Sequence, residues 1–136
     1  MSQPTAQEQE GEGLKPLKKW PAEELLTAAE GLAGIGQEEA VRTQLYKILS
    51  SFKRLQREFL QQRAFDRDRV RFLEVELAWT ASKHGKLRDV CNAVMDKISL
   101  VQDERDFERL VRFIEAIVAF NAFGKRRQPQ AGRTRR

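Results

Sequence analysis

The segment from Asp103 to Gly124 constrains the fold more than any other, because its apolar side chains recur at helical spacing on two sides of one helix. The first stripe consists of Phe107, Leu110, Val111, Ile114, Ile117 and Val118. The second stripe, on roughly the opposite side, consists of Phe113, Ala116, Phe120 and Phe123. A helix that is apolar on two sides either runs through the middle of a bundle or gives its second side to another subunit. The sequence leaves both arrangements open.

Two further helical segments precede residue 64. The first begins at Pro21, whose fixed φ suits a first helical turn, and it ends among the glycines between residues 31 and 36. The second runs from Glu38 to about Arg63 and is apolar on one face only. That face consists of Val41, Leu45, Ile48, Leu49, Phe52, Leu55 and Phe59.

A third helical segment, over residues 66–84, is apolar on two sides like the last one. Asp66 or Asp68 can cap its start, and Gly85 is suited to a left-handed stop. Its two stripes are Val70, Leu73, Leu77 and Ala81 on one side, and Phe72, Val75 and Trp79 on the other. A fourth segment, over about residues 86–100, has one apolar side. No segment alternates like a strand, so the sequence predicts an all-α fold, an antiparallel bundle of about five helices with disordered N- and C-terminal tails.

The length of 136 residues suits one domain with tails. We expect residues 1–19 to be a disordered segment or linker, residues 20–124 to be the helical bundle domain, and residues 125–136 to be a flexible basic tail. No apolar run approaches the roughly 20 residues of a membrane span, and the acidic start is unlike a signal peptide. We therefore expect no membrane partner and a cytoplasmic location. The single cysteine, Cys91, fits a reducing compartment.

The net charge of +5 is concentrated after Gly124. Six basic residues lie there without an acid: Lys125, Arg126, Arg127, Arg133, Arg135 and Arg136. Residues 1–124 hold 19 basic and 20 acidic residues, a net charge of −1. A polyanionic partner must therefore be argued from local patches. The tail can lie along phosphates or can merely keep the chain soluble, and its composition favours neither interpretation.

The outer side of the helix over residues 38–63 is the strongest candidate for a binding surface. At about 100° per residue, its basic residues and one tyrosine fall within an arc opposite the apolar face. They are Arg42, Tyr46, Lys47, Lys53, Arg54 and Arg57. Thr43 and Ser50 lie beside them, and Glu58 is the one acid near the arc. Such a face indicates a polyanionic partner, and the alternative is a helix that stays soluble through Lys and Arg.

No motif in the sequence indicates catalysis. His84 is the only histidine and Cys91 the only cysteine, so no further Cys or His is present to complete a zinc site. The acidic pairs Asp66/Asp68 and Asp103/Asp106 are explained as helix starts, with Asp103 as the cap of the last helix. There is no phosphate-binding glycine loop and no nucleophile motif. The sequence therefore predicts a protein that is not an enzyme and that has no metal and no cofactor.

The second stripes of the two-sided helices are candidates for contacts between subunits. The residues chosen as interface candidates are Phe72, Trp79, Phe113 and Phe120. Stacking of these aromatic rings on nucleic-acid bases is an alternative. Aromatic residues at helical spacing among aliphatic ones are more typical of packing, which favours a neighbouring copy or the centre of the bundle.

Three stretches carry a family resemblance. Residues 42–47 read Arg-Thr-Gln-Leu-Tyr-Lys, residues 73–83 read Leu-Glu-Val-Glu-Leu-Ala-Trp-Thr-Ala-Ser-Lys, and residues 113–120 read Phe-Ile-Glu-Ala-Ile-Val-Ala-Phe. In the same order, they are similar to a Thr-Thr-x-x-Leu-Arg helix start, a Leu-Lys-x-Lys-Leu-x-Tyr-x-Ala-x-Arg segment and a Phe-Glu-Ala-hydrophobic-Val-Ala-Tyr ending. The chain thus resembles the small helical subunit of type III-A CRISPR effector complexes, the Csm complexes.

This resemblance implies a non-catalytic subunit of an RNA-guided antiviral ribonucleoprotein. Several copies would stack head to tail beside other CRISPR effector subunits and would bind the backbone of guide RNA and target RNA without sequence specificity. Tyr46, Glu74, Glu76 and Lys83 depart from the family's basic pattern, because they stand where it has Arg, Lys, Lys and Arg. We nevertheless count Lys83 as a candidate RNA contact, as well as Lys125, Arg126 and Arg127. The alternative is a homodimeric helical adaptor with no nucleic-acid role.

Overall fold

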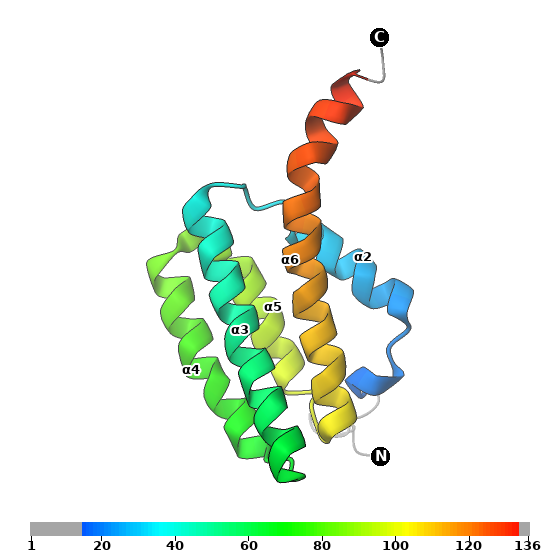
Figure 1. Cartoon of the computed structure of the whole chain (residues 1–136), viewed down its shortest axis with the longest axis vertical. Helices are drawn as coiled ribbons and strands as arrows, with labels where there is room; N and C mark the ends of the chain where they lie inside the picture. The colour runs from blue at the N-terminus through cyan, green and yellow to red at the C-terminus, as the bar shows by residue number, and fades with distance from the viewer. Residues whose placement is uncertain (1–14, 134–136) are drawn as a thin grey trace, which may run out of the picture.

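The computed structural model describes residues 15–133, with side chains described through Gly124, and this part of the chain forms an all-α bundle (Figure 1). Within it lie five α-helices and two short 3-10 turns. Their order is η1 (Leu17–Lys19), α2 (Ala22–Leu32), α3 (Glu39–Gln62), α4 (Arg67–Lys83), η2 (Gly85–Leu87), α5 (Arg88–Ile98) and α6 (Glu104–Arg133). The predicted all-α helical bundle is therefore confirmed.

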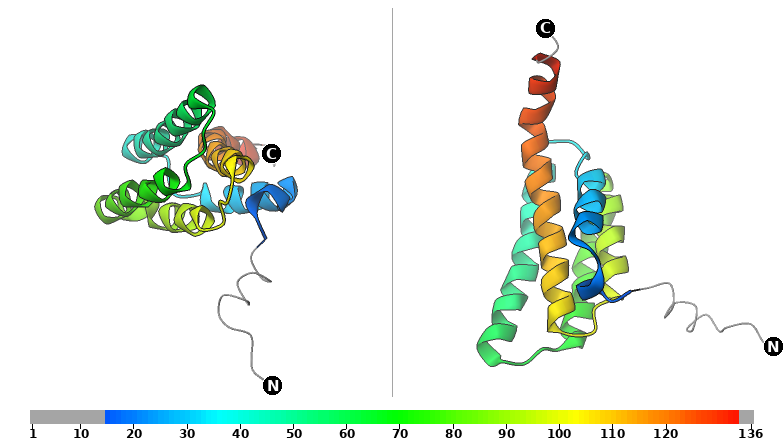
Figure 2. Two further views of the ribbon diagram at one scale, coloured as in Figure 1. Left: turned by 90° about the horizontal axis from the view of Figure 1, so that it is seen from below. Right: turned by 90° about the vertical axis from the view of Figure 1, so that its right-hand side faces the viewer.

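Helix α6 packs against three other helices, α2, α3 and α5 (Figure 2). All six residues of its first apolar stripe are buried, and Phe113 of the second stripe is buried as well, with 1% of its surface exposed. Ala116 and Phe120 are half-buried against the core, whereas Phe123 is exposed. Of the two arrangements that the sequence left open, the central position in the bundle therefore accounts for most of this helix.

Aromatic rings join α3 to α6 near the end of α3. The ring centroid of Phe107 lies 6.0 Å from that of Phe52 and 5.6 Å from that of Phe59. Phe65, in the loop after α3, packs edge-on against Phe59 with centroids 5.2 Å apart. Rings at these distances contribute about 0.5–1.5 kcal/mol per pair beyond the burial of their area. This cluster fixes the face of α3 that is turned inward.

The acidic caps occur where the sequence indicated them. Asp66 Oδ1 accepts a hydrogen bond from the backbone N–H of Asp68 at 3.0 Å, and Asp103 Oδ1 accepts one from the backbone N–H of Asp106 at 3.0 Å. Each carboxylate thereby satisfies one N–H group that the first helical turn leaves without a partner. The capping prediction is confirmed for Asp66 and for Asp103.

Two predicted helix ends were wrong. Gly85 is not left-handed, because His84 ends α4 in an extended conformation, with φ −128° and ψ 89°, and the chain then enters η2. Arg63 instead takes the left-handed conformation after α3, with φ 53°. Helix α6 does not end at Gly124 but continues to Arg133. The predicted flexibility of residues 125–136 stays a prediction, as does the disorder of residues 1–14, which lie outside the described residues.

The bundle begins earlier than residue 20, where the sequence placed its boundary. Leu17 is fully buried in the core. The backbone N–H groups of Lys18 and Gln102 donate to the two carboxylate oxygens of buried Asp106, each at 2.8 Å. Lys18 Nζ also pairs with Asp103 Oδ2 at 2.5 Å, and this hydrogen bond lowers the pKa of Asp103 and raises that of Lys18. These contacts attach the η1 segment to the start of α6.

Asn121 connects α6 to the loop between α2 and α3. Its side chain is 2% exposed, and its Nδ2 donates to the carbonyl oxygens of Ala33, at 2.9 Å, and Gly36, at 2.8 Å. Gly36 has φ +100°, a conformation that side chains rarely adopt. Asn121 therefore satisfies two loop carbonyl groups and holds the loop that positions the start of α3.

We predict that Asn121→Ala lowers the free energy of unfolding by about 1–3 kcal/mol, because it leaves the buried carbonyl group of Ala33 and the partly buried one of Gly36 without this donor. Asn92→Ala is the matched control, since Asn92 is exposed on α5. Urea denaturation of both variants measures the difference. Equal unfolding midpoints for the two variants would show that the Asn121 amide does not hold the loop.

Candidate nucleic-acid interface

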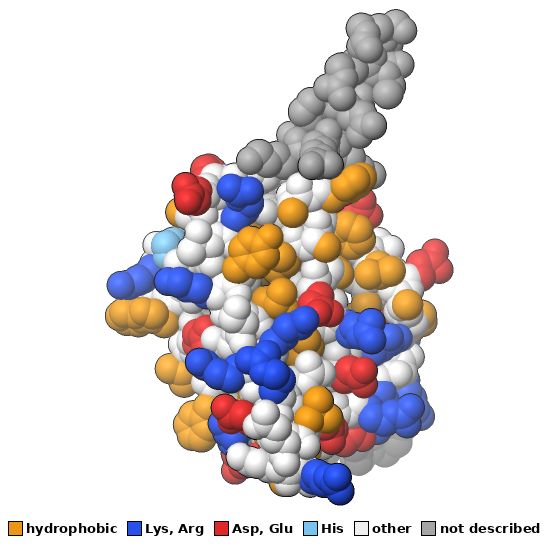
Figure 3. Space-filling model, viewed as in Figure 1, with side chains coloured by type: hydrophobic (Ala, Val, Ile, Leu, Met, Phe, Trp, Pro, Cys, Tyr) orange, Lys and Arg blue, Asp and Glu red, His pale blue; other side chains and the backbone are white. Residues whose placement is uncertain are grey.

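The outer face of α3 is basic, and most of the helix's large apolar residues turn inward, although Leu60 is exposed. Six of its apolar residues are buried: Val41, Leu45, Ile48, Phe52, Leu55 and Phe59. The 24 residues of α3 make it about 36 Å long at 1.5 Å per residue, so the opposite side is an extended polar surface. Figure 3 shows Lys and Arg side chains gathered over the lower half of this helix.

Two of the predicted contacts on α3, Lys53 and Arg42, are only partly exposed. Lys53 Nζ pairs with Glu115 Oε2 of α6 at 2.6 Å, with both side chains partly exposed. Arg42 is half-buried, and its Nε is buried without a hydrogen-bond partner. Lys53 is thus held near α6 by its ion pair, and Arg42 is partly covered by the bundle. They present less free positive charge to solvent than the sequence pattern indicated.

Three cations of the outer face are free of such partners. Lys47, Arg54 and Arg57 are exposed, and none has an ion pair or hydrogen bond among the described side chains. Tyr46 lies on the same side with 51% of its surface exposed. We call Lys47, Arg54 and Arg57 the free cations of α3. Uncompensated positive charge of this kind attracts an anionic partner.

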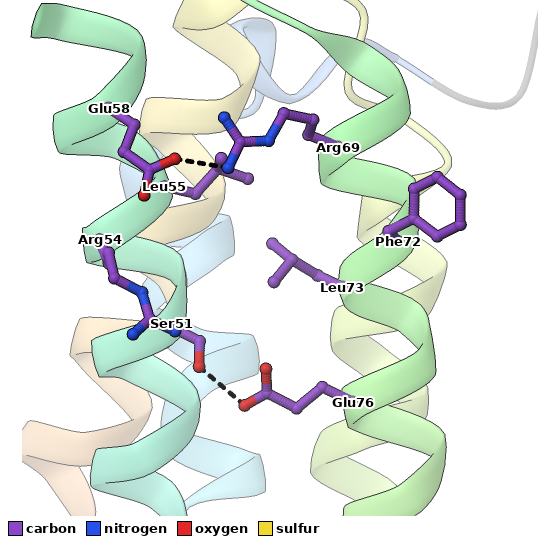
Figure 4. A pocket seen from close by; sticks show the side chains of 8 residues that line it. All are labelled: Ser51, Arg54, Leu55, Glu58, Arg69, Phe72, Leu73 and Glu76. Atoms are coloured by element: carbon purple, nitrogen blue, oxygen red, sulfur yellow. Dashed lines mark hydrogen bonds and ion pairs between the residues drawn. The ribbon is translucent and has the colours of Figure 1, made fainter.

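A groove separates α3 from α4. Its wider part is a hollow of about 490 Å³ lined by Thr43, Tyr46, Lys47, Ser50, Ser51, Arg54 and Glu76. An adjoining hollow of about 260 Å³ is lined by Ser51, Arg54, Leu55, Glu58, Arg69, Phe72, Leu73 and Glu76 (Figure 4).

Two polar contacts cross this groove between the helices. Ser51 Oγ donates to Glu76 Oε2 at 2.8 Å, and Arg69 pairs with Glu58 (Figure 4). Beneath them, Leu55 and Leu73 point toward each other from the two helices (Figure 4). The groove therefore has an apolar floor and a polar lining. Arg54 in that lining has no ion pair among the described side chains.

An exposed apolar stripe begins at Phe72, at the rim of this groove, and continues along the outer side of α4. Phe72 is 72% exposed and Trp79 is 63% exposed, and Val75 between them is exposed as well. Lys83 Nζ lies 4.8 Å from the centroid of the Trp79 ring, a cation–π contact. Lys83 therefore belongs to this stripe on α4 and not to the outer face of α3. We call Phe72, Val75 and Trp79 the α4 stripe.

Phe113 is not part of an exposed interface, which corrects its assignment as a subunit contact. It is buried inside the bundle, and Lys97 Nζ of α5 lies 4.5 Å from its ring centroid and 4.9 Å from that of Trp20. Burial lowers the pKa of Lys97. Sequence periodicity marked the second stripe of α6 correctly, but that side is covered by the chain's own helices. Phe120 is half-buried at the same edge.

Cys91 and His84, the cysteine and the histidine of the chain, lie where they serve the fold. Burial raises the pKa of the Cys91 thiol to about 11, so the thiol stays protonated at neutral pH. His84 ends α4, as its position before Gly85 indicated. Across the described residues, no group of three or more His, Cys, Asp or Glu side chains is placed to hold a metal ion. Lys125, Arg126 and Arg127 lie outside the described side chains, so their predicted role stays untested.

Sequence reasoning missed the α4 side of the groove. Glu76 and Arg69 line it, and Ser51 bonds across it, yet none was a candidate. Ser51 lies at the margin of the basic arc, and Glu76 was noticed only as a departure from a basic position. The available signal was that Glu76 lies one turn after Phe72 and Leu73, at the border between the two apolar stripes of α4, where a side chain can reach a neighbouring helix.

The fold and this surface define a small helical-bundle protein with one cationic helix face. A model of the Csm2 Type III-A family matches residues 19–127, which is most of the chain. The chain therefore belongs to the Csm2 family of type III-A CRISPR systems, whose members are structural subunits of the Csm effector complex. Comparison with curated proteins and with solved structures gave no significant match. Among the described residues, no helix has the length and hydropathy needed to cross a membrane.

Proposed function

We propose that this chain is a non-catalytic subunit that binds the phosphate backbone of guide RNA and target RNA inside the type III-A complex. The observation that carries this proposal is the set of free cations on α3, Lys47, Arg54 and Arg57, which have no acidic partner among the described side chains. Other basic residues nearby, such as Lys53 and Arg69, are paired. Family membership supplies the RNA-guided setting, and the bound complex acts in the cytoplasm.

Binding of the RNA backbone through this face does not depend on the RNA sequence. Arg offers a planar fork to phosphate oxygens, and the hydroxyl groups of Thr43 and Ser50, both exposed, can bond to phosphate or sugar. Contacts of this kind position a protein along a nucleic acid without reading its bases. In an RNA-guided complex, base pairing between guide and target already supplies the sequence. A backbone-binding helix face is therefore sufficient for the subunit's role.

We predict that reversing Arg54 and Arg57 to Glu weakens RNA binding about equally for unrelated sequences. Each lost phosphate contact should reduce the slope of log K against log salt by about 0.7–0.9. The measurement is a salt titration of RNA binding by a chain that ends at Gly124, since the six basic residues beyond it would mask the effect.

A control for net charge is the reversal of Lys19 and Arg88 to Glu, because both are exposed and lie outside α3. This variant should retain the salt slope of the starting chain. The proposal fails if the shortened chain binds no RNA, alone or assembled with its partners, or if both double variants behave alike. In that case the basic face is merely solvated, and the helical adaptor becomes the better account.

The α4 stripe supports a second part of the proposal, the stacking of copies. Exposed aromatic residues in a row are unusual on a monomer and mark contact surfaces. Phe72 and Trp79 occupy one side of a single helix. The contact is therefore heterologous unless α4 of one copy packs on α4 of another. A repeated heterologous contact builds a filament. We infer that the stripe meets a neighbouring copy or another subunit of the complex.

We predict that Phe72→Glu combined with Trp79→Glu abolishes self-association and incorporation into the reconstituted complex while the fold is kept. The reason is that both side chains are exposed, so their replacement removes no core contact. Sedimentation velocity, pull-down and circular dichroism measure the three properties. Leu60→Glu is the control, because Leu60 is also exposed but lies on α3. Unimpaired assembly of the double variant contradicts the assignment.

A further inference from the structure

The wider hollow of the α3–α4 groove combines groups of the backbone-binding face with an exposed aromatic ring and a carboxylate. Lys47 and Arg54 bring free positive charge, Thr43 and Ser50 bring hydroxyl groups, and Tyr46 brings an exposed aromatic ring. Its volume of about 490 Å³ lies in the range of small-molecule sites, about 300–1,000 Å³. A cation, a hydroxyl and an aromatic ring suit the phosphate, the sugar and the base of a nucleotide.

Glu76 is the one side chain in this hollow that is unexpected at a phosphate-binding surface. A carboxylate beside phosphates is repulsive, and here it lines the same hollow as Lys47 and Arg54. Only one of its oxygens, Oε2, has a hydrogen-bond donor, Ser51 Oγ at 2.8 Å (Figure 4). A carboxylate accepts about four hydrogen bonds, so Glu76 retains acceptor capacity on both oxygens.

We propose that this hollow binds one unpaired nucleotide of the RNA and prefers guanine there. Tyr46 stacks on the base, Lys47 and Arg54 hold its phosphate, and the Glu76 carboxylate accepts hydrogen bonds from the base edge. This proposal rests on the RNA-binding function proposed above and deepens it, because it adds recognition of a base at one position to a surface that otherwise contacts the backbone.

The preference for guanine follows from the donors on each base. Guanine presents two adjacent N–H donors, N1–H and N2–H, which match the two oxygens of a carboxylate. Adenine and cytosine present an amino group beside an acceptor nitrogen, which repels the carboxylate. Uracil presents one N–H between two carbonyl oxygens. Glu76 therefore forms a two-point contact with guanine alone, and unpaired bases are read through this edge in RNA recognition.

The experiment compares four RNA pentamers, UUGUU, UUAUU, UUCUU and UUUUU, in fluorescence anisotropy with the full chain. All four carry the same backbone charge, so the contribution of residues 125–136 cancels in the ratios. We expect UUGUU to bind about five-fold more tightly than UUUUU, the low end for a two-point base contact because the hollow is open to solvent. Tyr46→Leu should weaken all four pentamers together through lost stacking.

Glu76→Gln separates base recognition from charge. It should reduce the preference for UUGUU below about two-fold and should bind UUUUU as well as or better than the wild type, since a negative charge is removed. Glu74→Gln is the matched control on α4, because Glu74 pairs with Arg71 at 2.8 Å and does not line the hollow. This control should keep the five-fold preference.

Equal affinities of the wild type for the four pentamers overturn the nucleotide site, and this result stands even if Glu76→Gln does not fold. If a 20-nucleotide RNA still binds and its binding still depends on Arg54 and Arg57, the backbone-binding function survives that failure. If the 20-nucleotide RNA does not bind either, both proposals are wrong. Absence of pentamer binding at concentrations where the long RNA binds likewise overturns the site alone.

Discussion

Helix α6 is buried against α2, α3 and α5 at once, and this burial decides which faces of the other helices turn inward. Its Phe107 side packs on the aromatic rings of α3, and its Phe113 side is closed by the chain's own helices and by Lys97. Because α6 takes the inward face of α3, the outward face of α3 has no helix over it. The same packing therefore produces both the core and the exposed cationic surface.

A second consequence is that some basic residues near α3 are paired with acids while others are free. Ion pairs join the margins of α3 to its neighbours: Lys53 of α3 meets Glu115 of α6, and Arg69 of α4 meets Glu58 of α3. Exposed pairs of this kind contribute little to stability, commonly about 0–1 kcal/mol, so their effect on the fold is small. Their effect on the surface is larger, because they leave the free cations confined to a narrow strip beside the α3–α4 groove.

Local features of the fold could be predicted from the sequence, whereas pairings between distant segments could not. Asp66 and Asp103 cap helices through N–H groups two or three residues away, so a short window of sequence contains the whole interaction. Phe113 and Phe72 both look like second stripes on two-sided helices, yet one is buried and the other is exposed. Periodicity gives the side of a helix, but which side meets a neighbour depends on how the helices assemble.

The candidate site shows the same limit. The basic arc of α3 could be read from a single helix, and the free cations lie within it. The Lys53–Glu115 pair joins residues on different helices, and the Ser51–Glu76 bond joins α3 to α4, so neither was accessible to a pattern within one helix. Gly85 illustrates a different limit, since glycine permits a left-handed turn without requiring one.

In the assembled complex, we expect the outer face of α3 to lie on RNA. Ultraviolet cross-linking of the native assembly, followed by peptide mapping of this chain, tests it most directly. We predict cross-links in peptides that cover residues 42–57, with Tyr46 as the aromatic residue closest to the RNA. Cross-links confined to residues 125–136, or to the α4 stripe, would contradict the account.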